Sequence, residues 1–246
     1  EKVILLGTSH MEMFSKQLTD ALIEKDYQVQ SLTFSGCPYL IGFTKYFNKT
    51  LSNECNGIGE MLRNELLSSD EAIVVISNRL PLYLSSRFIK DHNGFKESSG
   101  LIEFRHKDNL SVKEGFLSAY SELLEYGHKV LFIYPVPEMA RNVRKYYFQR
   151  SMFKFKNFQE MYIPYDLYKE RASSSFDLLD TFSDNNVERV YPDHHLCSEN
   201  DNKCITIIDN KILYTDENHL NKNGVLLILP DIINKIDILS NLLDSQ

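Results

Sequence analysis

Near its start the chain reads Lys2-Val3-Ile4-Leu5-Leu6-Gly7-Thr8-Ser9-His10. The apolar part, Lys2 to Leu6, is predicted as a buried strand, and Met11 to Lys25 carries apolar residues at helical spacing. A serine between such a strand and helix lies at the carboxyl edge of a parallel sheet, where open α/β sheets bind ligands. Backbone amides at a helix start can also stabilise an oxyanion. Ser9 is therefore a candidate nucleophile, with helix capping as its alternative role.

The alternation of strand and helix continues along the chain. Short apolar runs are separated by stretches of helical period, which is the pattern of a parallel sheet with helices on both faces. Further strands are predicted at Tyr27 to Phe34, Glu71 to Ser77, His128 to Tyr134 and Glu188 to Tyr191, and helices at Ile58 to Leu67, Val112 to Tyr126 and Leu220 to Leu239. Cys204 to Tyr214 is predicted as a hairpin around Asp209 and Asn210. Because there is no internal repeat or linker, residues 1–246 are predicted to form a single α/β domain with a five-stranded, mainly parallel sheet.

The segment Glu138 to Phe182 interrupts this regularity with clustered basic and aromatic side chains. It is predicted as an insertion over one end of the sheet. Such a mixture occurs in sites for single-stranded nucleic acid, in sugar-binding clefts, and in long loops that use aromatic residues only for packing. Tyr146 and Tyr147 are candidate substrate-binding residues, because aromatic faces can cover the apolar faces of sugar rings.

The composition excludes several classes of protein. Of the 246 residues, 43% are hydrophobic and 25% are charged, which is typical of a folded globular protein. The formal charge of -7 repels phosphate backbones, so a nucleic-acid partner is not expected. The apolar runs are far shorter than the roughly 20 residues that cross a bilayer, and no stretch has the pattern of a signal peptide.

Four cysteines bear on the compartment. Among the possible pairings, only Cys37 with Cys55 and Cys197 with Cys204 closes two short loops. Two disulfides are therefore the leading prediction, and they imply an oxidising compartment. The alternatives are four reduced thiols in a cytosolic enzyme, or a zinc site that joins Cys197 and Cys204 to two neighbouring histidines without the usual paired spacing. Neither a metal ion nor an organic cofactor is expected.

A second candidate element lies near the other end, at Tyr214-Thr215-Asp216-Glu217-Asn218-His219-Leu220, just before the last predicted helix. Asp216 and His219 are three residues apart, so the carboxylate can accept one imidazole N–H and leave the other ring nitrogen free as a base. Such a pair can activate a serine. The alternative is a helix cap formed by Asp216 or Asn218, with His219 exposed.

The two elements together resemble the SGNH hydrolase superfamily, whose nucleophile lies in a Gly-Asp-Ser motif after the first strand and whose Asp-x-x-His lies near the C-terminus. Beyond them, the chain is similar to the SGNH domain attached to the C-terminus of membrane-embedded acyltransferase-3 proteins, which acylate bacterial surface glycans. The resembling blocks follow the family's order from end to end of the chain: Leu5 to His10, Gly36-Cys37-Pro38, Val74 to Arg79, Tyr134 to Glu138, Cys197 with Cys204, and Tyr214 to Leu220. The resemblance implies a three-layer α/β/α, SGNH-type (flavodoxin-like) fold.

The resemblance also implies roles for three residues. Ser9 corresponds to the nucleophile, His219 to the base, and Asp216 to the residue that orients the base. Thr8 stands where the family motif has aspartate, so a carboxylate that orders the nucleophile loop is missing. The substitution removes no atom that takes part in the chemistry.

Further roles follow from the same resemblance. The backbone amides of Ser9 and Gly36 correspond to oxyanion donors, and Asn78 is the candidate for the superfamily's asparagine donor, although its setting is not the usual Gly-x-Asn. Arg79 either faces the cleft as a substrate-binding residue or pairs with a surface carboxylate.

The expected activity is acyl-ester chemistry on a bacterial surface glycan. The resemblance implies an O-acyltransferase, such as an O-acetyltransferase, that moves an acyl group from a donor to a sugar hydroxyl of a glycan acceptor. It further implies an N-terminal transmembrane acyltransferase domain in the same, longer chain, and a location at the periplasmic or extracytoplasmic face of the inner membrane. The alternatives are a free-standing extracytoplasmic carbohydrate acetylesterase and a catalytically degenerate glycan-binding module.

Overall fold

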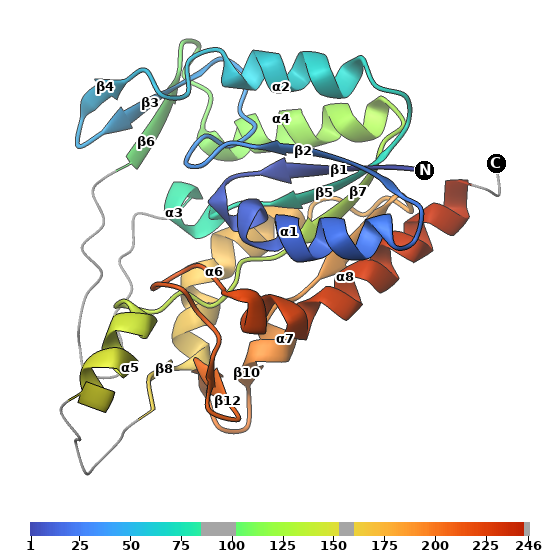
Figure 1. Ribbon diagram of the computed structural model, residues 1–246. Coiled ribbons are helices and arrows are strands. Elements are labelled where there is room, and N and C mark those ends of the chain that lie inside the picture. Colours follow the sequence, from blue (N-terminus) through green and yellow to red (C-terminus); the bar gives the residue numbers. More distant parts are fainter. Residues whose placement is uncertain (85–101, 153–159, 244–246) are drawn as a thin grey trace.

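A five-stranded parallel sheet forms the centre of the molecule (Figure 1). The computed structural model describes residues 1–84, 102–152 and 160–243. The strands stand in the order β2-β1-β5-β7-β9. Their bounds are β1 Lys2–Gly7, β2 Gln28–Thr33, β5 Ile73–Ser77, β7 Lys129–Ile133 and β9 Val187–Val190. Every neighbouring pair in this sheet is parallel, which confirms the prediction from the sequence.

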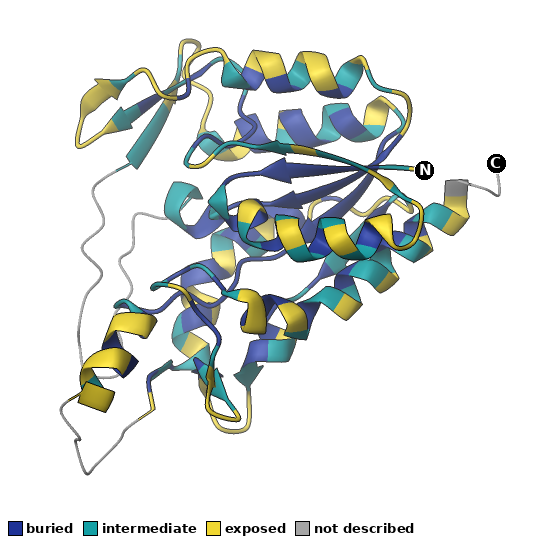
Figure 2. Cartoon of the chain, in the orientation of Figure 1, coloured by how far each residue is buried: buried dark blue, intermediate teal, exposed yellow. Residues whose placement is uncertain are grey.

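Helices cover both faces of the sheet, α1 and α8 on one and α2 and α4 on the other (Figure 1). Their bounds are α1 Ser9–Ile23, α2 Ile58–Leu67, α4 Val112–Glu125 and α8 Lys222–Leu243. In β1, Val3 and Leu5 belong to the buried cluster of α1 and α8, whereas Ile4 and Leu6 belong to the cluster of α2 and α4. Burial on both faces explains why this strand reads as an unbroken apolar run (Figure 2). The three-layer α/β/α architecture is therefore confirmed.

The topological switch point lies between β1 and β5. From β1 the chain passes to β2 on one side and later to β5 on the other, so the loops after β1 and β5 diverge at one edge of the sheet. A Cβ atom added to Gly7 would lie 2.0 Å from the carbonyl oxygen of Ser77, and the Thr8 amide donates to that same oxygen (3.3 Å). The chain can leave β1 this close to β5 only because Gly7 has no side chain.

The segment Glu138 to Phe182, which was predicted as an insertion, contains both a regular helix and added elements. Its second half contains α6 (Tyr165–Leu179), the regular crossover helix between the parallel strands β7 and β9. Arg171 and Ser175 are buried in α6 and break the apolar period that would have revealed the helix in the sequence. The elements added to the crossover are α5 (Val143–Met152) and β8 (Tyr162–Ile163).

Small antiparallel sheets complete the described part of the chain, and most of them were not predicted. One contains β3 (Phe43–Phe47), β4 (Thr50–Ser52) and β6 (Ile102–His106), and another contains β8, β10 (Cys197–Ser198) and β11 (Lys203–Ile205). The predicted hairpin is present as β12 (Ile207–Ile208) and β13 (Lys211–Ile212). Asp209 and Asn210 both adopt positive φ at its tip, as the tight turn between antiparallel strands requires. Two short helices, α3 (Leu80–Leu84) and α7 (Asp193–Leu196), follow β5 and β9.

All four cysteines are paired. Cys37 is bonded to Cys55, and Cys197 to Cys204. The alternatives of free thiols and of a zinc site at Cys197 and Cys204 are therefore wrong. Within the described ranges, no helix has the length and apolar character needed to cross a membrane.

Candidate active site

Ser9, His219 and Asp216 form a continuous line of hydrogen bonds at the carboxyl edge of the sheet. The Ser9 hydroxyl oxygen lies 2.9 Å from Nε2 of His219, and Nδ1 of His219 lies 2.8 Å from Oδ2 of Asp216. The two ends of the chain are thus brought together over 210 residues. An imidazole held between a hydroxyl and a carboxylate has the geometry to accept the hydroxyl proton.

The turn before α8 fixes the carboxylate of Asp216. Its Oδ1 accepts hydrogen bonds from the backbone amides of Asn218 (2.9 Å) and His219 (2.8 Å), which leaves Oδ2 for the imidazole. The Thr215 amide donates to the His219 carbonyl (2.8 Å) and closes the turn. Burial raises the pKa of Asp216, but the hydrogen bonds from His219 and the two amides outweigh it and lower this pKa to about 2. Asp216 is therefore an anion at neutral pH and accepts a hydrogen bond from Nδ1 of His219.

The three side chains remain accessible from outside. The side chains of His219 and Asp216 are 27% and 28% exposed, and Ser9 is partly exposed. Ser9 is the first residue of α1, so its hydroxyl lies beside the free amides of the helix start. A substrate carbonyl can approach these groups without any rearrangement of the core.

Gly36 lies in a tight turn that follows β2. The Cys37 amide donates to the Phe34 carbonyl (3.0 Å), and Gly36 has a φ of 70°, as the third position of a type II turn demands. The Phe34 amide donates to the Gly7 carbonyl (2.9 Å), which joins this turn to the end of β1 next to Ser9. The turn therefore places the Gly36 amide at the same edge of the sheet as the hydroxyl.

Asn78 differs from the expectation. Its side chain is buried, and its Nδ2 donates to the hydroxyl of Tyr120 in α4 (3.0 Å). Because Tyr120 belongs to the buried cluster of α2 and α4, this contact turns the amide toward the core. The structure gives Asn78 a packing role and does not direct its amide nitrogen to Ser9.

Arg79 forms an ion pair with a carboxylate, as one of its two predicted roles requires. Its Nε and Nη2 donate to Oε2 of Glu138, at 3.1 and 2.6 Å. The Glu138 side chain is only 2% exposed, so the partner is a buried carboxylate and not a surface one. Nη2 of Arg171 lies 3.9 Å from the same oxygen. Burial raises the pKa of Glu138, but the two arginines outweigh it and hold this pKa below its usual value.

The sequence contained a signal for this pair that was not used. Arg79 and Glu138 each follow a strand, β5 and β7, and these strands are neighbours in a parallel sheet. Opposite charges that follow neighbouring parallel strands meet at the same edge. The pair lies close to the turn of Asp216 and His219, since the Met139 amide donates to the Glu217 carbonyl (2.6 Å).

His10 is a further buried group beside the site. Its Nε2 lies 3.1 Å from Oδ1 of Asn218, and its ring centre lies 5.1 Å from that of His219. Burial lowers the pKa of His10 to about 4, so the ring is neutral at pH 7. A neutral His10 holds Asn218, and thereby the turn that carries His219, without placing a positive charge next to the His219 ring.

Tyr146 and Tyr147, which were predicted as substrate-binding residues, are both buried. The guanidinium groups of Arg141 and Arg150 lie over the Tyr146 ring, at 4.8 and 4.9 Å from its centre. The Tyr147 hydroxyl is 2.7 Å from the hydroxyl of Thr206, but this residue still lines a pocket. Among the described residues, no group of three His, Cys, Asp or Glu side chains is arranged to hold a metal ion.

Comparisons with known proteins agree with this architecture. The periplasmic domain of a lipopolysaccharide acetyltransferase from Salmonella ser. Paratyphi A superposes with a TM-score of 0.62 at 19% identity, over 96% of this chain and 83% of that one. A candidate acylhydrolase of Bacteroides fragilis gives a TM-score of 0.51 at 12% identity, over 96% and 86% of the two chains. At these identities the likeness shows the fold alone. No curated protein sequence matches the chain.

The family model described as "SGNH domain (fused to AT3 domains)" matches residues 1–234. This match covers the strand that precedes Ser9, the turn of Asp216 and His219, and the first part of α8. The chain therefore belongs to the family of SGNH domains that are fused to AT3 domains.

Proposed function

We propose that the domain transfers an acyl group, such as acetyl, to a sugar hydroxyl of a bacterial surface glycan, with Ser9 as nucleophile. The observation that carries this proposal is the hydrogen-bonded line from Ser9 through His219 to Asp216. The membership of the family and the shared fold of a lipopolysaccharide acetyltransferase domain support the choice of a glycan as acceptor.

In the proposed reaction, the Ser9 oxygen attacks the acyl carbonyl while its proton passes to Nε2 of His219. Asp216 stabilises the imidazolium that results. The tetrahedral intermediate expels the donor's alcohol, which takes the proton from His219, and an ester on Ser9 remains. The sugar hydroxyl then gives its proton to His219, attacks this ester, and leaves with the acyl group as Ser9 is restored.

The amides of Ser9 and Gly36 are the proposed donors to the oxyanion. Ser9 lies at the helix start, and Gly36 lies in the turn joined to the end of β1. The side chain of Asn78 is left out of this role, since its Nδ2 donates to Tyr120. Two donors that are already in place can stabilise the charge without further ordering.

The proposed location is the periplasmic or another extracytoplasmic compartment. Two disulfides persist best in an oxidising environment. The family description supports a longer chain in which an AT3 domain precedes this one and supplies the acyl group from a membrane. Glycan, acyl donor and AT3 domain are then the partners of the domain.

Hydrolysis of 4-nitrophenyl acetate tests the nucleophile, because water can replace the sugar hydroxyl as acceptor. Ser9→Ala is expected to lower the rate above background by about 1,000-fold or more. Its melting temperature should stay close to that of the wild type, because Ser9 is partly exposed and Ala is a good helix residue.

Ser15→Ala is the matched control, since Ser15 lies in the same helix and its hydroxyl donates only to the Met11 carbonyl (3.1 Å). Its rate of hydrolysis should equal that of the wild type. Equal hydrolysis by wild type and Ser9→Ala would remove Ser9 as the nucleophile and would favour a glycan-binding module without catalysis.

A further inference from the structure

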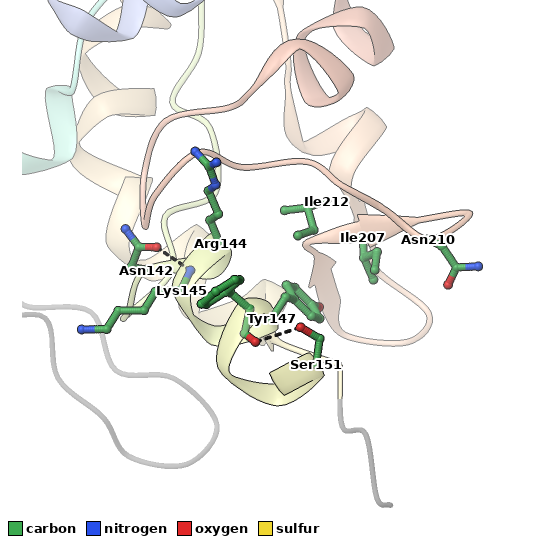
Figure 3. Close-up of a pocket in the computed structure, with 9 residues that line it drawn as sticks. Asn142, Arg144, Lys145, Tyr147, Ser151, Ile207, Asn210 and Ile212 are labelled. Carbon is green, nitrogen blue, oxygen red and sulfur yellow. Dashed lines mark hydrogen bonds between the residues drawn. The ribbon is translucent and has the colours of Figure 1, made fainter. Parts of the chain in front are cut away.

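A pocket of about 720 Å³ lies between α5 and the β12–β13 hairpin (Figure 3). Its volume is in the range of sites that hold small organic ligands. Its walls come from the element that is added to the β7–β9 crossover and from the hairpin that precedes the catalytic turn. Neither wall belongs to the five-stranded sheet or to the helices α1, α2, α4 and α8 that cover it.

The pocket adjoins the proposed active site through the backbone. The amide of Val143, the first residue of α5, donates to the carbonyl of Asp216 (3.2 Å). Arg144, the next residue, lines the pocket. On the other side, the hairpin is followed by Leu213, whose carbonyl accepts from the Asn221 amide (2.9 Å) just beyond His219. A ligand in the pocket therefore lies beside the turn that carries the proposed base.

The inner surface of the pocket is suited to a sugar ring. Tyr147 of α5 lies on the side of the pocket opposite Ile207 and Ile212 of the hairpin (Figure 3), and Phe148 of α5 also lines the pocket. Phe148 is 62% exposed, so much of its ring is open to a ligand. Aromatic and aliphatic side chains can cover the apolar faces of sugars while polar groups at the rim bind their hydroxyls.

The charge of the pocket is opposite to that of the whole chain. Arg144 and Lys145 line it, and none of the described lining residues is acidic. Neither cation forms an ion pair with a described side chain, and Figure 3 shows Arg144 extending from α5 at the rim. In a chain of net charge -7 this local excess of positive charge favours an anionic ligand.

We propose that this pocket is the acceptor subsite and that it selects an acidic glycan, bound through a sugar carboxylate at Arg144. The guanidinium offers paired donors to a carboxylate, and Lys145 adds positive potential beside it. The role of the pocket as an acceptor site rests on the proposed function. Binding of an acidic sugar in the pocket can be measured without any turnover.

Titration with trigalacturonate and with neutral maltotriose tests this selection. The chain carrying Ser9→Ala is used, so that binding is measured without chemistry. Trigalacturonate is expected to bind at least about tenfold more tightly than maltotriose, as one charge-assisted hydrogen bond can provide. Trigalacturonate should also shift the amide NMR signals of Ile207 and Ile212, which lie on the hairpin wall.

Arg144→Gln is expected to weaken trigalacturonate binding about tenfold and to leave maltotriose binding unchanged. Lys113→Gln is the matched control, because it removes the same charge from an exposed position in α4 and should change neither affinity. Equal affinity for the two sugars, or no effect of Arg144→Gln, would overturn the proposal. So would Arg144-dependent binding to phosphatidylglycerol vesicles without binding of trigalacturonate, since the pocket would then hold a lipid headgroup.

Discussion

At the scale of single residues, His10 shows how a buried neutral group can support a charged site. The ring is 1% exposed and lies among Glu138, His219 and Arg79, whose charges partly cancel at this position. Burial dominates and lowers the pKa of His10 to about 4. Because the unfolded chain has a histidine pKa near 6.5, folding excludes a proton that the unfolded chain would bind between these two pH values.

Because folding excludes this proton from His10, the free energy of unfolding should fall as the pH falls from 6.5 toward 4. The contribution of His10 to the loss between pH 7 and pH 5 is about 2 kcal/mol. His10→Gln keeps a donor for Asn218 but cannot titrate. In urea unfolding, the free energy of unfolding of this variant should therefore fall by about 2 kcal/mol less between pH 7 and pH 5 than that of the wild type. His128, whose pKa is also lowered by burial, remains in both proteins, so its effect on the pH dependence is the same in each. The same pH dependence in the two proteins would show that His10 is not held neutral.

The sequence predicted part of this constellation for a physical reason. Ser9, Asp216 and His219 lie in short local patterns, a strand end and a helix start, whose geometry fixes where each side chain points. The ion pair of Arg79 and Glu138 can be predicted only once β5 and β7 are known to be neighbouring strands. The contact between Asn78 and Tyr120 could not be predicted, because the sequence does not show that a buried tyrosine lies within reach of this amide.

At the scale of elements, the strands and helices of the central layers were predictable because each has one clear period. In β1, Val3 to Leu6 are all apolar, and α4 begins with a capping box in which Ser111 and Glu114 hydrogen-bond each other's backbone. α6 was missed because polar side chains are buried in it, and β3 and β6 were missed because they pair across more than 50 residues of chain. Long-range pairing of short strands leaves little local signal.

The disulfide Cys37–Cys55 connects the turn of Gly36 to the start of α2, and its loss should affect both stability and catalysis. The chain-entropy model gives about 3 kcal/mol for this bridge and about 2 kcal/mol for Cys197–Cys204, which closes a shorter loop. Urea unfolding of the double variants Cys37→Ser/Cys55→Ser and Cys197→Ser/Cys204→Ser measures the two values.

Hydrolysis of 4-nitrophenyl acetate should distinguish the two bridges further. A loosened Gly36 turn weakens an oxyanion donor, so the first double variant should lose between about tenfold and about 100-fold in kcat. The second serves as the control, because Cys197 and Cys204 lie in a separate small sheet. Loss of activity in both variants alike would mean that the Gly36 turn has no particular role in the reaction.

At the scale of the whole molecule, the proposed catalytic groups lie at the carboxyl edge of the sheet, and α5 and the β12–β13 hairpin form a pocket beside them. The helices α1 and α8 carry or adjoin Ser9 and His219, and these belong to the common three-layer plan. α5 and the β12–β13 hairpin lie outside that plan and form the pocket. Such a division would let the choice of acceptor change without altering the proposed catalytic groups.

The pocket lies beside the turn that carries His219, so a sugar bound there could accept an acetyl group from Ser9. An acetyl group on Ser9 can pass to water or to a sugar hydroxyl, and a sugar held beside the turn of His219 has a far higher effective concentration than a free one. Wild-type protein incubated with 4-nitrophenyl acetate and trigalacturonate should therefore produce acetylated trigalacturonate, detected by mass spectrometry. Maltotriose should yield less product, because it lacks the carboxylates that would hold it at Arg144.

Three variants determine what such a product means. Ser9→Ala should form none, which excludes direct acetylation of the sugar by the donor. Arg144→Gln should lower the ratio of acetylated trigalacturonate to free acetate, and Lys113→Gln should leave this ratio unchanged, because Lys113 lies in α4 and does not line the pocket. If nitrophenol release depended on Ser9 but no sugar were acetylated, water would be the acceptor in this domain. The domain would then be an esterase, and the transfer step would have to be dropped from the proposed function.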